Sequence, residues 1–312
     1  MKKLLVVCML LLMVGCSSEK KINVGVIQFM QHEALDSATQ GFVDVLTAEY
    51  GDAVVVDVKN ASGDSSVCAT IATNFVADGY DLIMANATPA LQAAAHATNS
   101  IPVLGTSVTE YGVALDIDNF NGLVGTNVSG TSDLAPLDEQ AQMILDLVKD
   151  VKNVGLLYCS AEANSIYQVK VVKEYLESKG IITELYSFSD SNDVASVAAQ
   201  ACSEVDALYI PTDNTCASYG TVIANAANES KTPIITGEKD TLKVCEGLAT
   251  LSIDYYELGK TTGQMAVKIL NGEAKVSEMP IEYYENPTKM YIEDSCRKLG
   301  IDIPEGYTKI ED

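Results

Sequence analysis

An apolar run from Ala207 to Pro211 stops abruptly at Thr212-Asp213-Asn214-Thr215. Side chains of these types can cap a following helix by bonding its free N–H groups. They can also bind a solute, because a carboxylate such as Asp213 pairs with an ammonium group. A helix start, in turn, suits a carboxylate or phosphate. For each of these residues taken alone, both roles stay open.

The elements that would position this stretch alternate between strands and helices. We predict strands at 23–28, 54–58, 81–85 and 101–104, and helices at 34–49, 66–78 and from Thr88-Pro89 onward. The same order then recurs, with strands at 154–158, 182–186, 207–211 and 233–236 and helices at 166–178, 193–202 and 216–228. A further strand at 249–253 and a helix at 255–270 follow.

Residue-level parallels support an internal repeat. Tyr80-Asp81-Leu82-Ile83 matches Val205-Asp206-Ala207-Leu208 in character, and Ile101-Pro102-Val103-Leu104 matches Thr232-Pro233-Ile234-Ile235. Alternating strands and helices predict parallel sheets with right-handed crossovers. We therefore expect an α/β fold of two Rossmann-like lobes with a ligand cleft between them.

Three chain crossings would join these lobes as a hinge. The stretch 122–133 is rich in Gly, Ser and Thr and is interpreted as the first crossing. The strand and helix after the second unit can return to the first lobe. We assign 22–131 and 252–276 to lobe one, and 132–251 and 277–312 to lobe two.

Ligands of open parallel sheets bind outside the carboxyl ends of the strands. That rule selects the loops 29–33, 86–89 and 106–108 in lobe one, and 160–165, 212–215 and 237–239 in lobe two. Because facing loops of both lobes are polar, a ligand site gains support over simple helix capping. The candidate ligand-binding residues in these loops are His32, Thr88, Thr106, Ser107, Asn164, Ser165, Thr212, Asp213, Asn214 and Glu238.

Patterns for catalysis are weak. The chain has two histidines, His32 and His96, and neither lies in HExxH; GxGxxG, GxxxxGK[ST] and GxSxG do not occur. A cofactor-free racemase would need opposed cysteines from both lobes, and Cys216 has no counterpart in the 86–89 loop. A Ser-His-acid triad stays open. We expect a binding protein rather than an enzyme, with no cofactor and no metal.

The charge argues against a nucleic-acid partner, and the N-terminus points to export. With 20 basic and 43 acidic residues and no basic cluster, the chain is not expected to bind nucleic acid. Met1-Lys2-Lys3, an apolar run to Val14 and Gly15-Cys16 resemble a bacterial lipoprotein signal. We predict that residues 1–15 are removed, that Cys16 is lipidated and that 16–21 form a tether. A plain signal peptide, with Cys16 incidental, is the alternative.

Six cysteines follow Cys16, and their long, irregular spacing does not suit a zinc site. Most fall in apolar periodic segments, where cysteine behaves as a small hydrophobe. Export would permit pairing, but we expect free buried thiols. They are Cys68, Cys159, Cys202, Cys216, Cys245 and Cys296.

Several ordered stretches are similar to the tryptophan/tyrosine-type family of ABC transporter substrate-binding proteins. They are 26–28 through His32, 34–36, 60–64, 87–90, 130–133, 160–165, 209–215, 237–238 and 253–259. The resemblance covers nearly all of the mature chain. It departs from the family at Glu33, where Pro commonly follows the histidine, and at Cys216, where a small residue is usual.

The resemblance implies a type I periplasmic binding fold and an extracytoplasmic lipoprotein held to the membrane only through Cys16. Such a protein, expected to be a monomer, delivers a small solute to a membrane permease and its ATPase. Aromatic amino acids are the family's best-attested solutes. The alternatives are a ligand sensor for a receptor, or a binding protein for a nucleoside or sugar.

The resemblance also adds Gln28 and Asp254 to the candidate ligand contacts. In the resulting hypothesis Asp213 accepts hydrogen bonds from a ligand ammonium. Residues that would hold the carboxylate are Thr88, Asn164 and Ser165, and residues that would frame the side chain are Phe29, Met30, His32 and Tyr167.

Overall fold

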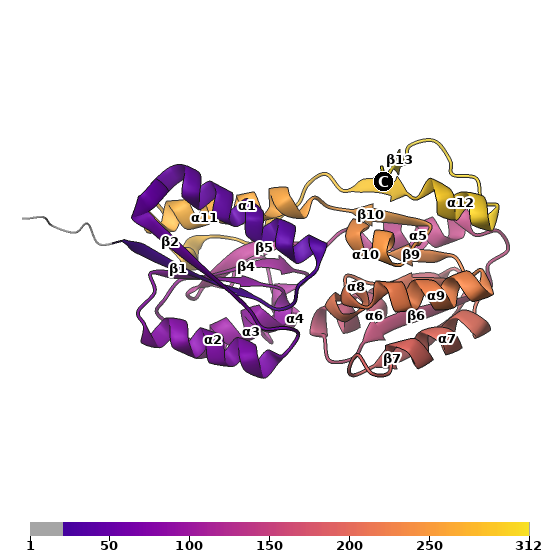
Figure 1. Ribbon diagram of the computed structural model, residues 1–312, viewed down its shortest axis with the longest axis horizontal. Coiled ribbons are helices and arrows are strands. Elements are labelled where there is room, and N and C mark those ends of the chain that lie inside the picture. The colour runs from indigo at the N-terminus through magenta and orange to yellow at the C-terminus, as the bar shows by residue number, and fades with distance from the viewer. Residues whose placement is uncertain (1–20, 312) are drawn as a thin grey trace, which may run out of the picture.

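Buried apolar runs form the strands of two separate sheets, which give the molecule two α/β lobes (Figure 1). The computed structural model describes residues 21–311. The strand order is β11-β5-β4-β3-β1-β2 in lobe one and β13-β12-β10-β9-β8-β6-β7 in lobe two. Paired strands run parallel, except β10 and β12. Repeated β-α units of this kind cover both sheet faces with helices.

The strands of lobe one are β1 (Ile22–Gln28), β2 (Val54–Asn60), β3 (Leu82–Asn86), β4 (Val103–Val108), β5 (Val128–Ser132) and β11 (Glu282–Tyr283). Those of lobe two are β6 (Asn153–Cys159), β7 (Ile182–Phe188), β8 (Ala207–Ile210), β9 (Ile234–Thr236), β10 (Ala249–Ser252), β12 (Thr288–Tyr291) and β13 (Thr308–Lys309). Central strands such as β3 and β8 are buried along their whole length.

The helices of lobe one are α1 (Glu33–Tyr50), η1 (Gly51–Ala53), α2 (Ser65–Ala77), α3 (Thr88–Ala97), α4 (Tyr111–Ala114), α11 (Tyr255–Leu270) and η2 (Val276–Glu278). Those of lobe two are α5 (Leu137–Leu147), α6 (Ala163–Ser178), α7 (Val194–Glu204), α8 (Asn214–Ser218), α9 (Gly220–Ser230), α10 (Lys239–Val244) and α12 (Glu293–Leu299). Within residues 21–311, no helix has both the length and the apolar character needed to cross a bilayer.

Helix α11 follows the lobe-two sheet in sequence but packs against α1 of lobe one (Figure 1). Two glycines allow the helix backbones to touch. A Cβ on Gly41 would collide with the carbonyl oxygen of Tyr256, and a Cβ on Gly259 would collide with that of Ala38. This contact returns the chain to lobe one after its second crossing.

The element bounds place the three crossings at 133–136, 253–254 and 284–287. The third crossing differs from the division predicted from sequence, in which the chain returns to lobe two at residue 277. Strand β11 pairs with β5, so the chain stays in lobe one through Tyr283. The stretch 122–133, interpreted as a crossing, contains β5 itself. A search for hydrophobic periodicity does not find either strand, because β11 has only two residues and the sequence of β5 is VSGTS.

Other differences concern element ends. Strand β4 continues through Thr106 and Ser107, beyond the predicted end at residue 104, since these polar residues are buried. The predicted helix 216–228 is two helices, α8 and α9, which meet at Tyr219. Helices α5 and α10 do not feature in the sequence prediction.

Candidate functional site

Strand-end loops of the two lobes meet around a small buried cavity. Its lining comes from the start of α1, the end of β4, the first crossing, the starts of α6, α10 and α11, and α8 with the loop before it. The free space is about 10 Å³, room for one water molecule. The lining residues are His32, Ala34, Leu35, Ser107, Asp133, Asn164, Thr212, Asp213, Asn214, Ala217, Glu238, Thr241 and Tyr255.

Lobe one contributes the start of α1 and the end of β4. His32 is the N-cap residue of α1, yet no side chain caps the helix. The first-turn residues Ala34 and Leu35 lie at the cavity, so the free N–H groups of this helix start are close to it. Ser107 has φ of 53°, a left-handed conformation that is uncommon for serine.

Asp133 lies at the first crossing, directly after β5. Its Oδ2 accepts a hydrogen bond of 3.0 Å from the hydroxyl of Tyr255, at the start of α11. Its Oδ1 is buried and has no hydrogen-bond partner. Burial raises the pKa of Asp133, while the hydroxyl groups of Thr109 and Tyr255 favour the charged form. A carboxylate with one free oxygen therefore faces the cavity from the hinge.

In lobe two, the buried carboxylate of Glu162 ties the loop before α6 to the start of α8. Its Oε2 accepts from Asn214 N (3.1 Å) and Asn214 Nδ2 (2.6 Å). Its Oε1 accepts from Thr215 N (3.0 Å) and Thr215 Oγ1 (2.9 Å). Burial, with the nearby charge of Asp213, raises the pKa of Glu162 to about 7. Asn164 donates to Thr212 O at 2.8 Å, leaving its own Oδ1 toward the cavity without a partner.

Asp213 acts as a helix cap. Its Oδ1 accepts from Cys216 N at 2.8 Å and its Oδ2 from Cys159 N at 2.7 Å. Burial raises its pKa, and these backbone donors oppose that rise. Glu238 caps α10 in the same way, accepting from the N–H groups of Asp240 and Thr241. Both carboxylates line the cavity and also accept hydrogen bonds from the first N–H groups of a helix.

Unpartnered polar atoms converge on this cavity. Burying a polar group without a partner costs about 1–3 kcal/mol, so such atoms mark a place where another molecule bonds. Eight buried side-chain atoms lack a hydrogen-bond partner within residues 21–311, and five belong to residues of the cavity lining. The five are His32 Nδ1, Ser107 Oγ, Asp133 Oδ1, Asn164 Oδ1 and Thr241 Oγ1.

Few hydrogen bonds and ion pairs hold the lobes together across the cleft. His32 Nε2 lies 3.1 Å from Asn214 Oδ1. Lys243 of α10 pairs with Glu33 of α1 at 2.8 Å on the exposed rim. Two further cross-lobe bonds within residues 21–311 run from Ser218 Oγ to Met30 Sδ (2.7 Å) and from Gln168 Nε2 to Thr109 Oγ1 (3.3 Å).

The structure brings seven sequence-predicted residues to the cavity: His32, Ser107, Asn164, Thr212, Asp213, Asn214 and Glu238. Five others do not line it: Gln28, Thr88, Thr106, Ser165 and Asp254. Their local roles explain this. Gln28 bonds Asp36 and Thr39 within lobe one, Thr106 bonds Thr131 inside the sheet, and Asp254 caps α11.

Thr88 and Ser165 are buried in the first turns of α3 and α6 without reaching the cavity. The residues expected to frame a ligand side chain lie in different places: Phe29 is in the lobe-one core, Met30 contacts Ser218, and Tyr167 packs beside the hinge. Of these only His32 lines the cavity.

Sequence reasoning missed Asp133, Thr241 and Tyr255. Asp133 and Tyr255 fall in stretches 130–133 and 253–259 that carry the family resemblance, so a signal existed without an assigned role. Thr241 lies in an unpredicted short helix and has no such signal. The geometry does not support the racemase alternative, because the Cys216 side chain is fully buried and does not line the cavity. Within residues 21–311, all six cysteines are free and buried.

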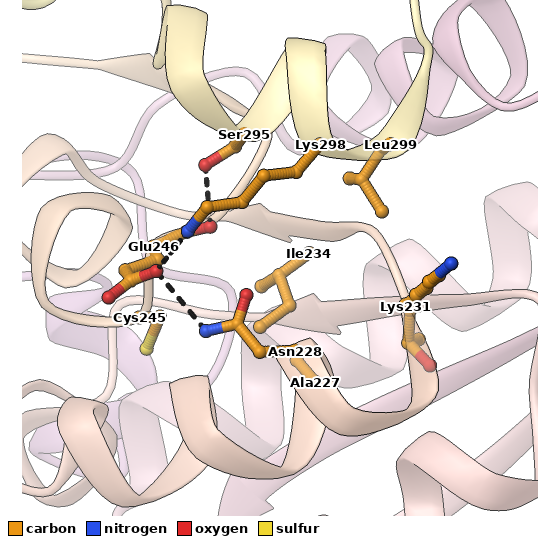
Figure 2. Close-up of a pocket in the computed structure, with 10 residues that line it drawn as sticks. Ala227, Asn228, Lys231, Ile234, Cys245, Glu246, Ser295, Lys298 and Leu299 are labelled. Carbon is orange, nitrogen blue, oxygen red and sulfur yellow. Dashed lines mark hydrogen bonds and ion pairs between the residues drawn. The ribbon is translucent and has the colours of Figure 1, made fainter.

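A larger hollow of about 250 Å³ lies between α9 and α12, as Figure 2 shows. Its polar groups bond one another: Glu246 accepts from Lys298 (2.8 Å) and Asn228 (3.1 Å), and Ser295 donates to Glu246 O (2.8 Å). None of its lining side chains has a buried polar atom without a partner. The cleft cavity is therefore the better candidate site.

Comparison with known proteins agrees with this two-lobed arrangement. Residues 23–310 match the family model described as ABC transporter substrate binding protein. The chain is 33% identical over 290 residues to a tyrosine-binding protein of Clostridioides difficile (strain R20291), covering 91% of this chain and 82% of that protein.

Two solved structures of similar sequence identity superpose on this one with different TM-scores. An ABC domain from Streptococcus pneumonia in complex with L-Trp is 36% identical, covers 93% of this chain and 100% of its own, and superposes with a TM-score of 0.87. A ligand-free, open substrate-binding protein with adhesive properties from Clostridium difficile is 35% identical, with coverage of 93% and 99%, but its TM-score is 0.70.

The family model spans nearly the whole described chain, and the two parallel-sheet lobes are those of a type I periplasmic binding protein. The expected α/β fold with two lobes is thereby confirmed, as is the family that the sequence resembles. This chain belongs to the ABC transporter substrate-binding proteins.

Proposed function

We propose that the protein captures an aromatic amino acid outside the cytoplasm and delivers it to an ABC importer. Two relatives support this class of ligand, since one is named a tyrosine-binding protein and another was solved with L-Trp. The cleft itself supports a zwitterionic ligand. The observation that carries the proposal is the set of buried, unpartnered polar atoms in the cavity lining.

The chemistry of these atoms fits the two ends of an amino acid. An ammonium group has three N–H donors and no acceptor, and a carboxylate only accepts. Asp133 Oδ1 and Asn164 Oδ1 are acceptors, so we assign them to the ammonium. The Ser107 hydroxyl and the uncapped start of α1 can donate, so we assign them to the carboxylate.

This assignment replaces the earlier hypothesis for Asp213. Both oxygens of Asp213 already accept backbone N–H groups, whereas Asp133 keeps one oxygen free. Electrostatics also favour the ligand's ammonium group, because the buried carboxyl groups of Asp213 and Glu238 line the same cavity. The apolar side chains of Ala34, Leu35 and Ala217 offer contacts to a ring. Because the free space is about 10 Å³, room for one water molecule, an amino acid can enter and be held only when the lobes lie further apart than in this structure.

A thermal-shift panel tests the proposal. The mature protein without lipid, residues 19–312, is heated with each amino acid, with nucleosides and with sugars. A ligand present at about 100 times its dissociation constant should stabilise the fold by about 2.7 kcal/mol. The chain has no tryptophan, so bound L-tryptophan would also be the only indole emitter. Stabilisation by a nucleoside or sugar, with none by any amino acid, would reject the aromatic ligand.

We further propose that Cys16, which lies outside the described residues, carries the lipid anchor. Two or more acyl chains give stable membrane attachment. A Cys16→Ser variant should leave the membrane fraction and stay out of the detergent phase in a phase-partition assay. Uptake of labelled tyrosine or tryptophan by cells lacking this protein, with and without complementation, tests its link to a permease and ATPase.

A further inference from the structure

Three residues form a hydrogen-bonded chain that crosses the cleft. Glu162 and Asn214 belong to lobe two, and His32 belongs to lobe one. Asn214 Nδ2 lies 2.6 Å from Glu162 Oε2, and Asn214 Oδ1 lies 3.1 Å from His32 Nε2. The other ring nitrogen, His32 Nδ1, is buried at the cavity with no partner.

The donors and acceptors of this chain have one consistent direction. Glu162 accepts from both the backbone and the side chain of Asn214, and from both the backbone and the side chain of Thr215. While Glu162 is ionised, it can only accept, so the Asn214 amide turns its NH₂ to Glu162 and its carbonyl oxygen to His32. Since burial and the charge of Asp213 raise the pKa of Glu162 to about 7, this orientation holds above that pH. A carbonyl oxygen only accepts, so His32 must carry a proton on Nε2.

We propose that the Glu162–Asn214 pair sets the tautomer of His32 when the lobes close, making His32 Nδ1 an acceptor for an N–H or O–H group of the ligand. His32 is then a specificity-determining residue that Asn214 positions. In a neutral imidazole one nitrogen donates and the other accepts. The inference rests on the proposed function, since it concerns the same ligand.

The surroundings of His32 keep the imidazole neutral. Burial lowers its pKa, and the bond to Asn214 opposes that effect. Three carboxylates also raise its pKa: Asp36 on its own helix, Asp213 before α8 and Asp240 on α10. The adjoining Glu33 is paired with Lys243 at the rim. Burial outweighs these charges, so Nδ1 keeps its lone pair near neutral pH.

Because the chain has only two histidines, ¹⁵N-histidine NMR can read this tautomer directly. The exposed His96 is removed by His96→Gln, which assigns the remaining signal to His32. With saturating L-tryptophan or L-tyrosine, we expect a proton on Nε2 and none on Nδ1. An Asn214→Ala variant should show both tautomers. A bound state with Nδ1 protonated would overturn the inference.

Ligand analogues identify which donor His32 contacts. Indole-3-propionate lacks the ammonium group, and 1-methyl-L-tryptophan lacks the ring N–H. If His32 contacts the ammonium, His32→Gln weakens L-tryptophan and 1-methyl-L-tryptophan alike, by roughly ten- to a hundredfold, and spares indole-3-propionate. If it contacts the ring N–H, 1-methyl-L-tryptophan is the ligand that is spared. His96→Gln is the matched control and should change none of these affinities.

The two proposals fail in different ways. An unchanged L-tryptophan affinity in His32→Gln, beside a measurable affinity in the wild type, would reject the role of His32 and leave amino acid binding intact. No binding of any amino acid to the wild type would reject the proposed function instead. Folding of each variant is checked by its melting temperature without ligand.

Discussion

The hydroxyl of Tyr255 donates a 3.0 Å hydrogen bond to Asp133 Oδ2, which joins the first crossing to the start of α11, directly after the second crossing. The two residues are 122 positions apart in sequence. This bond uses one carboxylate oxygen and leaves Oδ1 buried at the cavity without a partner. The hinge thus supplies one unpartnered carboxylate oxygen to the cavity, beside the groups that the strand-end loops of both lobes supply.

Replacing Asp133 with Asn should weaken amino acid binding strongly. The change keeps the shape of the side chain but removes the charge that we assign to the ligand ammonium. Losing one partner of a buried charge pair costs about 2–5 kcal/mol, or at least tenfold in affinity. Titration calorimetry with L-tryptophan and L-tyrosine measures the effect. Asp150→Asn, an exposed change before β6, is the control, and equal affinities for both variants would contradict the assignment.

The Asp213→Asn variant should behave in the opposite way. Both oxygens of Asp213 accept hydrogen bonds from backbone N–H groups. In the variant, the amide NH₂ would therefore point at one of these N–H groups, and two donors cannot bond each other. We expect a loss of stability of about 1–3 kcal/mol and a smaller loss of affinity than in Asp133→Asn. Melting temperature and calorimetry are measured on both variants. If Asp213→Asn loses more affinity than Asp133→Asn, the ammonium partner is Asp213 after all.

Ligand binding should make the protein more compact in solution. Few hydrogen bonds and ion pairs cross the cleft, and an exposed ion pair such as Lys243–Glu33 contributes only about 0–1 kcal/mol. The lobes can therefore separate when no ligand bridges them. Small-angle X-ray scattering should show a smaller radius of gyration with L-tryptophan than without it. The same radius in both conditions, at saturating ligand, would contradict hinge closure.

Stability should fall as pH rises from about 4.5 to 8. Burial raises the pKa of Glu162 to about 7 and, with the charge of Glu238, that of Asp240 to about 6. A raised folded-state pKa stabilises the protein below the ordinary value of the group, and this stabilisation disappears as pH passes the raised value. Urea unfolding at constant ionic strength measures the slope.

A Glu162→Gln variant is the internal check on that slope, since it removes the largest of these titrations. Its stability should depend less on pH between 4.5 and 8 than that of the wild type. Glu177, Glu246 and Glu293 have lowered pKa values, so their stabilisation is lost only as pH falls further. His32 acts in the opposite sense, because burial lowers its pKa and its contribution to stability grows as pH rises through 6.5. An equal dependence on pH in the wild type and in Glu162→Gln would therefore show that Glu162 is not protonated as expected.

The repeat of strands and helices in the sequence was enough to predict two parallel-sheet lobes, because strand and helix periods depend on local burial alone. The same local patterns placed His32, Ser107 and Asn214 in strand-end loops, and these residues do meet at the cavity. Short elements have too few residues to show such a period. Strand β11 has two residues, and it stays in lobe one through its pairing with β5.

What decides the role of a polar residue is which of its atoms remain without a partner, and only the tertiary structure supplies that information. In sequence, Asp213 follows a predicted strand and is a candidate, whereas Asp133 lies in the 122–133 stretch interpreted as a crossing and is not. In the fold, backbone N–H groups from β6 and α8 occupy both oxygens of Asp213, while Tyr255 occupies one oxygen of Asp133. Hydrogen bonding between residues distant in sequence therefore selects the acid that is free to meet a ligand.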